Sequence, residues 1–126
     1  EFHGDYVDFP PVRCYPKPVQ KPHPPVYLGG SAKNVFRRAV AWGDGWMPTR
    51  ATPEQIKMGR ATLDELAEAA GRDPNSIVIM ASGVADRDEL KRMEDAGAAS
   101  ATVRLPSSAA GEAFPALEKL AQEFLA

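Results

Sequence analysis

The chain has few residues suited to a metal site or to covalent chemistry. Among its 126 residues there is one cysteine, Cys14, and there are two histidines, His3 and His23. A single cysteine excludes an intrachain disulfide and a thiolate metal cluster, and neither histidine has metal-ligand spacing. Both histidines lie in loop-like sequence, with no sign of a pairing that would make Cys14 a nucleophile. We therefore predict no metal and an inert thiol.

Strong net charge and long apolar runs are absent too. The formal net charge is −2 and no basic stripe alternates with aromatic residues, so we expect no nucleic-acid partner. No apolar run approaches the length of a membrane-spanning helix, and residues 1–4 lack the features of a signal peptide. We expect a cytoplasmic protein without a membrane partner. Residues 1–50 carry seven Lys or Arg against four acids, which suits an anionic ligand, although solvated surface charge is the simpler explanation.

Proline is concentrated at the start of the chain. Residues 1–25, called the lead-in here, hold seven of the twelve prolines, and proline cannot donate to a helix or sheet ladder. We predict an irregular, extended segment. It should pack on something, because it is too apolar for a free tail; its apolar residues are Phe2, Tyr6, Val7, Phe9, Val12 and Tyr15. The chain begins without methionine in loop-like sequence, which indicates a fragment or a processed product.

Strand and helix patterns alternate over residues 26–126. Apolar runs predict strands at 26–28, 45–47, 77–81 and 101–105. Helical spacing predicts helices after each strand, the last from about Gly111. We expect Ser31 to cap the first helix, and the pairs Thr52 with Gln55 and Asp86 with Glu89 to form capping boxes. The apolar residues expected on inward helix faces are Val35, Ala39, Trp42, Ile56, Leu63, Leu66, Ala70, Leu90, Met93, Phe114, Leu117, Ala121 and Phe124.

Four alternating strands and helices predict an α/β fold of parallel βα units. Right-handed crossovers bring the C-terminal ends of the strands to one rim, where α/β folds bind ligands. Gly29, Thr49, Ser82 and Arg104 are predicted along this rim. Four units make a small open sheet or half of an eight-unit barrel. A half-barrel leaves two open edges and poorly covered apolar residues, for which we name Ile77, Ile79 and Val103.

The most informative segment is Pro24–Ser31, an apolar strand that stops on Gly29 and Gly30. Glycines admit an anion to backbone amides that a side chain would shield. A helix that follows directly offers free N–H groups and a partial positive charge. The segment has neither the G-x-G-x-x-G spacing of a dinucleotide site nor the Gly-Lys-Ser/Thr of a P-loop. A plain strand-to-helix turn therefore remains the alternative.

An ordered set of motifs runs through the first fifty residues: Pro16–Gln20, Pro22–Ser31, Arg37–Ala39 and Gly43–Trp46. This set resembles the bacterial luciferase-like monooxygenase family, and most of all its coenzyme F420-dependent branch. The remaining residues agree with the family in the order of strands and helices. The resemblance implies that residues 26–126 form four βα units, the C-terminal half of a luciferase-like (β/α)8 TIM barrel, after an irregular Pro-rich segment at 1–25.

The resemblance also implies a cofactor, FMN or coenzyme F420, and a small-molecule substrate. In the family, the glycine turn after the fifth strand approaches the cofactor phosphate by its backbone, and the matching residues here are Gly29, Gly30 and Ser31. The residues just past the Asp-Gly-aromatic strand face the same phosphate and match Thr49 and Arg50. These five residues are the predicted cofactor site.

Other residues receive weaker or purely structural roles. Arg104 matches a position after the eighth strand where some relatives keep a basic group for an anionic substrate or cofactor. We expect Arg37 and Arg38 to face solvent or support a helix-to-loop junction. Asp44 is expected to bond backbone amides rather than act as a base, and Trp46 to enter the core rather than line the pocket.

No residue is named as catalytic. The first four βα units of the family, which supply most contacts to the cofactor ring, have no counterpart in this chain, so we expect the isolated chain to be inactive and its parent to be an oxidoreductase. Two alternatives remain open. One is a non-catalytic half-barrel that associates with itself or with the missing N-terminal half. The other is an anion- or sugar-phosphate-binding α/β enzyme that shares only the Gly-Gly turn.

Overall fold

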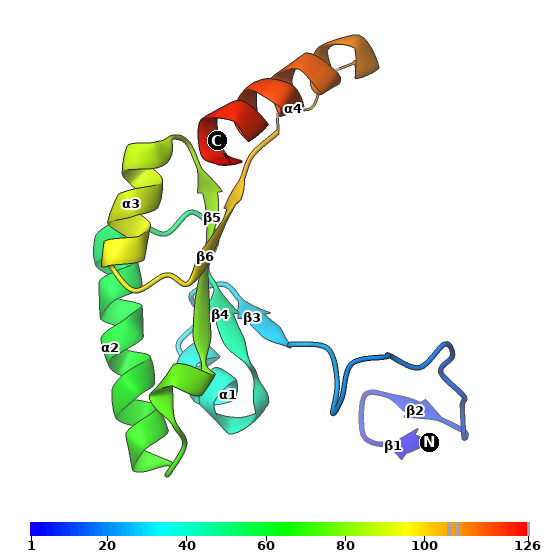
Figure 1. Cartoon of the computed structure of the whole chain (residues 1–126). Coiled ribbons are helices and arrows are strands. Elements are labelled where there is room, and N and C mark those ends of the chain that lie inside the picture. Colours follow the sequence, from blue (N-terminus) through cyan, green and yellow to red (C-terminus); the bar gives the residue numbers. More distant parts are fainter. Residues whose placement is uncertain (106, 108, 126) are drawn as a thin grey trace.

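The computed structural model describes residues 1–105, 107 and 109–125. Its main body is a four-stranded parallel sheet in the order β3-β4-β5-β6, and each of these strands is followed along the chain by an α-helix (Figure 1). The strands are β3 (Tyr27–Gly29), β4 (Gly45–Met47), β5 (Val78–Val84) and β6 (Ser100–Val103). The helices are α1 (Val35–Trp42), α2 (Pro53–Ala69), α3 (Arg87–Asp95) and α4 (Ala110–Leu125), with a short 3-10 turn at Pro74–Ser76. This α/β architecture confirms the predicted parallel βα units and is consistent with part of the expected barrel.

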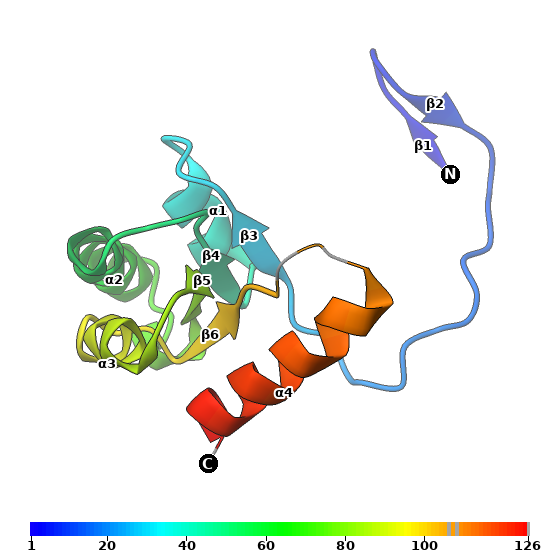
Figure 2. The ribbon, with the colours of Figure 1, turned by 90° about the horizontal axis from the view of Figure 1, so that it is seen from above.

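The three helices α1, α2 and α3 lie together on one side of the sheet, and the core lies between them and the strands (Figure 2). Residues paired across neighbouring strands share a face, and the register aligns Leu28, Trp46 and Ile79. All three are buried beneath the helices. Ile77 is fully buried as well, so the expectation that Ile77 and Ile79 are poorly covered is wrong. Ile77 and Ile79 are two residues apart, so both side chains point to the face of the sheet that the helices cover.

The opposite face of the sheet is the less covered one. Met47 is exposed there, and Val78 and Met80 are half-buried. Helix α4 lies apart from the other three, beyond β6 (Figure 2). Only its C-terminal end returns to the body, where Phe124 packs against the core, whereas Phe114 is 67% exposed. Leu117 is 51% exposed as well. The prediction that Phe114 and Leu117 face inward is therefore wrong, because the helix diverges from the sheet.

The lead-in extends away from the sheet in both views (Figure 1, Figure 2). Its only regular structure among the described residues is a small antiparallel hairpin of β1 (Phe2–His3) and β2 (Asp8–Phe9), in which the two Phe rings stack with centroids 6.2 Å apart. Tyr6 is 100% exposed, and Val12 and Tyr15 are exposed too. Packing of the lead-in on the rest of the chain, which the sequence led us to expect, is confined among the described residues to its last few residues, where the His23 imidazole lies 3.8 Å from the Asp44 carboxylate.

Helix α2 begins with the predicted capping box. The Thr52 hydroxyl accepts from the Gln55 amide at 3.3 Å, and the Gln55 side chain accepts from the Thr52 amide at 2.9 Å. The backbone amide of Glu54 and the Thr52 hydroxyl lower the pKa of the Glu54 carboxyl, since both bond its charged form. That contribution to stability is present above the unfolded-state pKa and is lost as the pH falls through the lowered folded-state pKa.

Helix α3 has only half of its predicted capping box. The Asp86 carboxylate accepts from the Glu89 amide at 2.7 Å, but the Glu89 carboxylate accepts from the Ala85 amide rather than from the Asp86 amide.

Two residues predicted to face inward at the ends of α1 and α2 are exposed instead. Trp42, the last residue of α1, is 52% exposed, with the Arg38 guanidinium 5.5 Å from its ring centroid. Ala70 lies past the end of α2 and is exposed, because Ala67 occupies the core position instead.

Replacing Thr52 with alanine removes the N-cap of α2. We expect Thr52→Ala to lower the free energy of unfolding by about 1 kcal/mol in urea denaturation. Thr62→Ala is the matched control, because the Thr62 hydroxyl donates to the Met58 carbonyl within the same helix, and alanine is the better helix former. Equal losses in the two variants would contradict the assigned cap.

Gly59 allows α2 to approach Trp46. A Cβ added at Gly59 would overlap the indole ring of Trp46. Alanine is favoured over glycine in a helix by about 1 kcal/mol, but the overlap makes us expect Gly59→Ala to destabilise by about 1–3 kcal/mol in thermal or urea unfolding. Gly111→Ala in α4, where a Cβ meets nothing within 4 Å, should cost no stability. A stabilised Gly59→Ala variant would show that the indole is free to move aside.

Candidate functional site

Strand β3 ends in a glycine turn whose second residue needs to be glycine for its backbone. Gly30 has φ +85, and a Cβ placed on it would meet nothing within 4 Å. The backbone conformation at this position therefore disfavours any residue with a side chain, while the space beside the backbone is free for a ligand. Gly29 lacks this constraint, and a Cβ there would lie 3.8 Å from the Met47 carbonyl. The Gly30 carbonyl accepts from the Trp46 indole nitrogen at 2.7 Å, which ties the turn to the core.

The helix after this turn starts later than predicted. Ser31 does not cap α1: the N-cap is Asn34, which makes no side-chain cap bond. A tight turn intervenes, in which the Val35 amide donates to the Ala32 carbonyl at 2.9 Å. The first turn of α1 contains no acidic residue, unlike the first turns of α2 and α3. Its partial positive charge is left without an acidic side chain from its own first turn.

The segment that follows β4 forms a second turn beside the first. Pro48 is buried, whereas Thr49 and Arg50 are exposed. Arg50 adopts φ 54, the left-handed region that non-glycine residues seldom occupy. The Ser82 hydroxyl at the end of β5 donates to the Pro48 carbonyl at 2.7 Å and accepts from the Arg50 amide at 3.3 Å. We call residues 48–50 the β4 turn.

Two cavities lie on either side of the β4 turn and share its three residues. The first, the Ser31 cavity, has a volume of about 250 Å³. Its other lining residues are Ser31, Phe36, Trp46, Ala51, Gln55 and Met58. The second, the Arg104 cavity, has a volume of about 370 Å³. Its other lining residues are Met47, Ser82, Gly83, Thr102 and Arg104. Both lie at the C-terminal ends of parallel strands, the rim predicted from the sequence.

The structure brings most of the predicted site residues together. Ser31, Thr49 and Arg50 line the Ser31 cavity, and Arg50 shares the Arg104 cavity with Arg104. Gly29 and Gly30 line neither cavity, although the Gly30 turn continues directly into Ser31. Among the described residues, neither Arg50 nor Arg104 takes part in an ion pair. Two guanidinium groups in one hollow without carboxylate partners favour an anionic occupant.

Sequence reasoning missed the contribution of Thr102 on β6 and of a β-bulge in β5. The register between β5 and β6 shifts between Ser82 and Val84, and Gly83 in the bulge has φ +74. The Gly83 amide donates to the Thr102 hydroxyl at 3.2 Å. A glycine at the end of a buried strand was the available signal, since isolated glycines in strands often mark bulges.

The structural roles predicted for neighbouring residues are largely as expected. Asp44 accepts from the Val26 amide at 2.7 Å, which confirms that it bonds the backbone. Arg37 and Arg38 are exposed. Trp46 is 3% exposed and packs edge-on against Phe36, which confirms its place in the core. It also lines the Ser31 cavity, so it serves both of the roles that we had set against each other.

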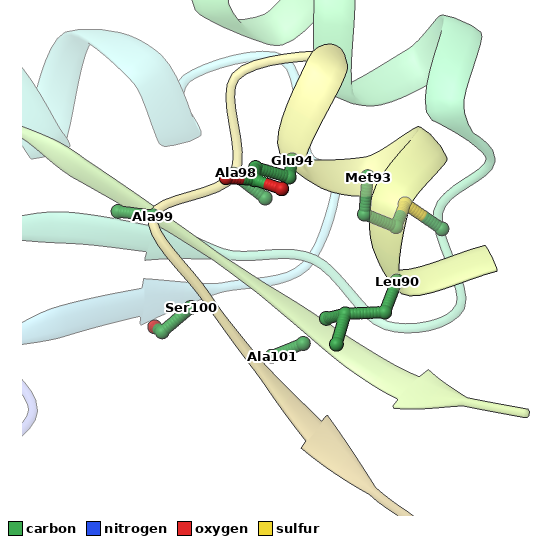
Figure 3. A pocket seen from close by; sticks show the side chains of 7 residues that line it. All are labelled: Leu90, Met93, Glu94, Ala98, Ala99, Ser100 and Ala101. Carbon is green, nitrogen blue, oxygen red and sulfur yellow. The ribbon is translucent and has the colours of Figure 1, made fainter. Parts of the chain in front are cut away.

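A further cavity lies at the other end of the sheet. It has a volume of about 280 Å³ and lies between α3 and the start of β6 (Figure 3). Leu90, Met93 and three alanines give it a largely apolar lining, and Glu94 is its one ionisable residue. It contains none of the predicted site residues and lies at the start of β6, away from the C-terminal ends of the strands, so it is not part of the candidate site.

Comparisons with known proteins identify relatives that match most of this chain. Uncharacterised proteins of Mycobacterium tuberculosis and Mycobacterium bovis are 32% identical over 123 residues, which is 95% of this chain and 42% of theirs. The chain thus spans less than half the length of these relatives. An FMNH2-dependent dimethylsulfone monooxygenase of Pseudomonas putida is 31% identical over 78 residues, 62% of this chain and 21% of its own length.

Two findings bear on the kind of protein. Among the described residues, no helix combines the length and the apolar character needed to cross a bilayer. The family model described as luciferase-like monooxygenase matches residues 1–122. This match covers almost the whole chain and agrees with the ordered motifs that precede β3 and follow it. The chain belongs to the luciferase-like monooxygenase family.

Proposed function

We propose that this chain binds the phosphate-bearing end of a reduced flavin or of coenzyme F420, as part of a luciferase-like oxidoreductase. The observation that carries the proposal is the convergence of Ser31, Thr49 and Arg50 on one cavity beside the Gly30 turn. FMN and F420 both carry a phosphate on a ribityl-type side chain. The Pseudomonas relative named for its use of FMNH2 supports a flavin, while the ordered motifs from Pro16 to Trp46 resemble the F420-dependent branch.

The residues of the rim fit such a group. Space above Gly30 lets an anion approach the backbone, and the uncapped start of α1 adds a partial positive charge. Arg50 supplies a full positive charge with no ion-pair partner among the described residues. The hydroxyl groups of Ser31 and Thr49 are further donors to phosphate oxygens.

The contribution of this chain is binding and orientation. The reduced cofactor, when bound, supplies the electrons of the reaction. Arg50 and the Gly30 turn would hold its charged end, and the indole of Trp46 fixes the turn by the bond to the Gly30 carbonyl. Arg104, across the β4 turn from Ser31, is the proposed contact for an anionic group of the substrate or of the cofactor.

The Gly30 turn offers a direct test with a matched control. Gly30 and Gly71 both have positive φ, and a Cβ at either would meet nothing within 4 Å. Alanine at each should therefore cost a similar strain, about 1–2 kcal/mol. Only Gly30→Ala places a methyl group at the proposed site, so we expect it to weaken binding of FMN or F420 about tenfold or more in a fluorescence titration, with Gly71→Ala unchanged.

Other outcomes of the same titration separate the alternatives. Binding of ribose 5-phosphate without binding of FMN or F420 would favour the sugar-phosphate alternative. Equal affinities of wild type and Gly30→Ala for FMN and F420 would remove the Gly30 turn from the site. Parallel titrations with reduced FMN and reduced F420 would decide which cofactor the rim prefers.

A second proposal concerns association. The sheet ends on β3 at one edge and β6 at the other, and its face opposite α1, α2 and α3 includes the exposed Met47. Unpaired strand edges beside exposed apolar side chains favour pairing with other chains. We propose that the 126-residue chain pairs with another copy or with further βα units of a longer protein.

Light scattering on the 126-residue chain tests this second proposal. We expect a mass above that of one chain, which rises with concentration. Met47→Lys should shift the equilibrium toward the single chain, because it places a charge on the uncovered face. Met58→Lys is the control, since Met58 is exposed on the helix-covered side. A single-chain mass at all concentrations, without binding of a hydrophobic dye, would reject self-association.

A further inference from the structure

Ser82 connects the central strand of the rim to the β4 turn. It lies near the C-terminal end of β5 and is half-buried. Its hydroxyl donates to the Pro48 carbonyl at 2.7 Å and accepts from the Arg50 amide at 3.3 Å. One side chain thus binds the residues on both sides of Thr49. A hydroxyl can do this because it carries one donor and two acceptor lone pairs.

The β4 turn needs such support because its backbone is strained. Arg50 has φ 54, a backbone conformation that is unfavourable for a non-glycine residue relative to its preferred conformations. Arg50 is also the residue shared by both rim cavities. A turn free to relax to negative φ would move the backbone that carries the guanidinium and Thr49.

Ser82 is itself held in place from the other side. It pairs in register with Thr102 of β6, and the Gly83 bulge follows it directly. The Gly83 amide donates to the Thr102 hydroxyl, which anchors the bulge to β6. Bulges beside functional sites commonly redirect a side chain. Ser82 directly precedes this bulge, and its side chain reaches the β4 turn.

We infer that Ser82 is a positioning residue, which holds Arg50 in its left-handed conformation and so sets where the guanidinium can meet an anion. This inference rests on the proposed function only in the identity of that anion, the phosphate of FMN or F420. The effect on the β4 turn itself concerns the ligand-free chain.

The experiment compares Ser82→Ala with Ser82→Thr and with Ser76→Ala. Ser82→Thr keeps the hydroxyl. Ser76 is the matched control, because its hydroxyl makes the same kind of bonds just before β5, donating to the Asp73 carbonyl at 2.7 Å and accepting from Arg72 at 2.9 Å. Each variant is measured in two ways: by the NMR shifts and amide exchange of Arg50 without ligand, and by the affinities for FMN and F420.

In Ser82→Ala we expect changed backbone shifts and faster amide exchange at Arg50, together with about a tenfold loss of affinity, the size of one lost hydrogen bond. Ser82→Thr should restore both. Ser76→Ala should change neither, whatever it does to stability. In an Arg50→Ala background, Ser82→Ala should cause little further loss of affinity, because its effect passes through Arg50.

Two results would overturn the inference: unchanged Arg50 shifts and exchange in Ser82→Ala, or a full additional loss of affinity in the Arg50→Ala background. If wild type binds neither FMN nor F420, the proposed function fails, and the NMR comparison still decides the role of Ser82. Should Ser82→Ala not fold, Ser82→Cys replaces it, because a thiol keeps the volume but is a weaker hydrogen-bonding group.

Discussion

The hydrogen bond from the Trp46 indole to the Gly30 carbonyl joins the core of this protein to its rim. Trp46 is almost fully buried, packs against Phe36 and lies so close to Gly59 that a methyl group there would overlap it. A buried indole N–H needs an acceptor, and the glycine turn supplies one at 2.7 Å. The same side chain therefore fills the space between sheet and helices and fixes the first turn of the candidate site.

The remainder of the rim follows from the parallel sheet. Because neighbouring strands end at the same edge, the β4 turn, Ser82 and Arg104 meet although they are far apart in the sequence. Two cavities result, separated by a turn whose strained Arg50 belongs to both. Other parts of the chain are packed less closely. The lead-in and the start of α4 carry exposed aromatic residues, and within the described part of the chain both outer strands of the sheet, β3 and β6, have one edge without a neighbouring strand.

Much of this fold was predictable because its signals are local. The β4 strand, the Thr52 capping box and the glycine ends of the helices depend on residues close together in the chain. The errors arose where a local pattern competes with its surroundings. Ser31 has the chemistry of an N-cap, yet a tight turn delays the helix to Val35. Trp42 has helical spacing from Val35, yet it lies at the end of α1, where it is exposed beside Arg38.

By itself the sequence determined the order of strands and helices, the parallel βα units and the glycine turn after β3, and it led to the hypothesis that this turn binds an anion. These depend on side-chain periodicity, glycine conformation and proline chemistry, which act over a few residues. Only the tertiary structure decided that Arg50 and Arg104 share a cavity, that the Ser82 hydroxyl bonds the β4 turn and that most of the lead-in stays uncovered. Those features depend on distances between residues brought together by strand pairing and packing, and no local pattern encodes them.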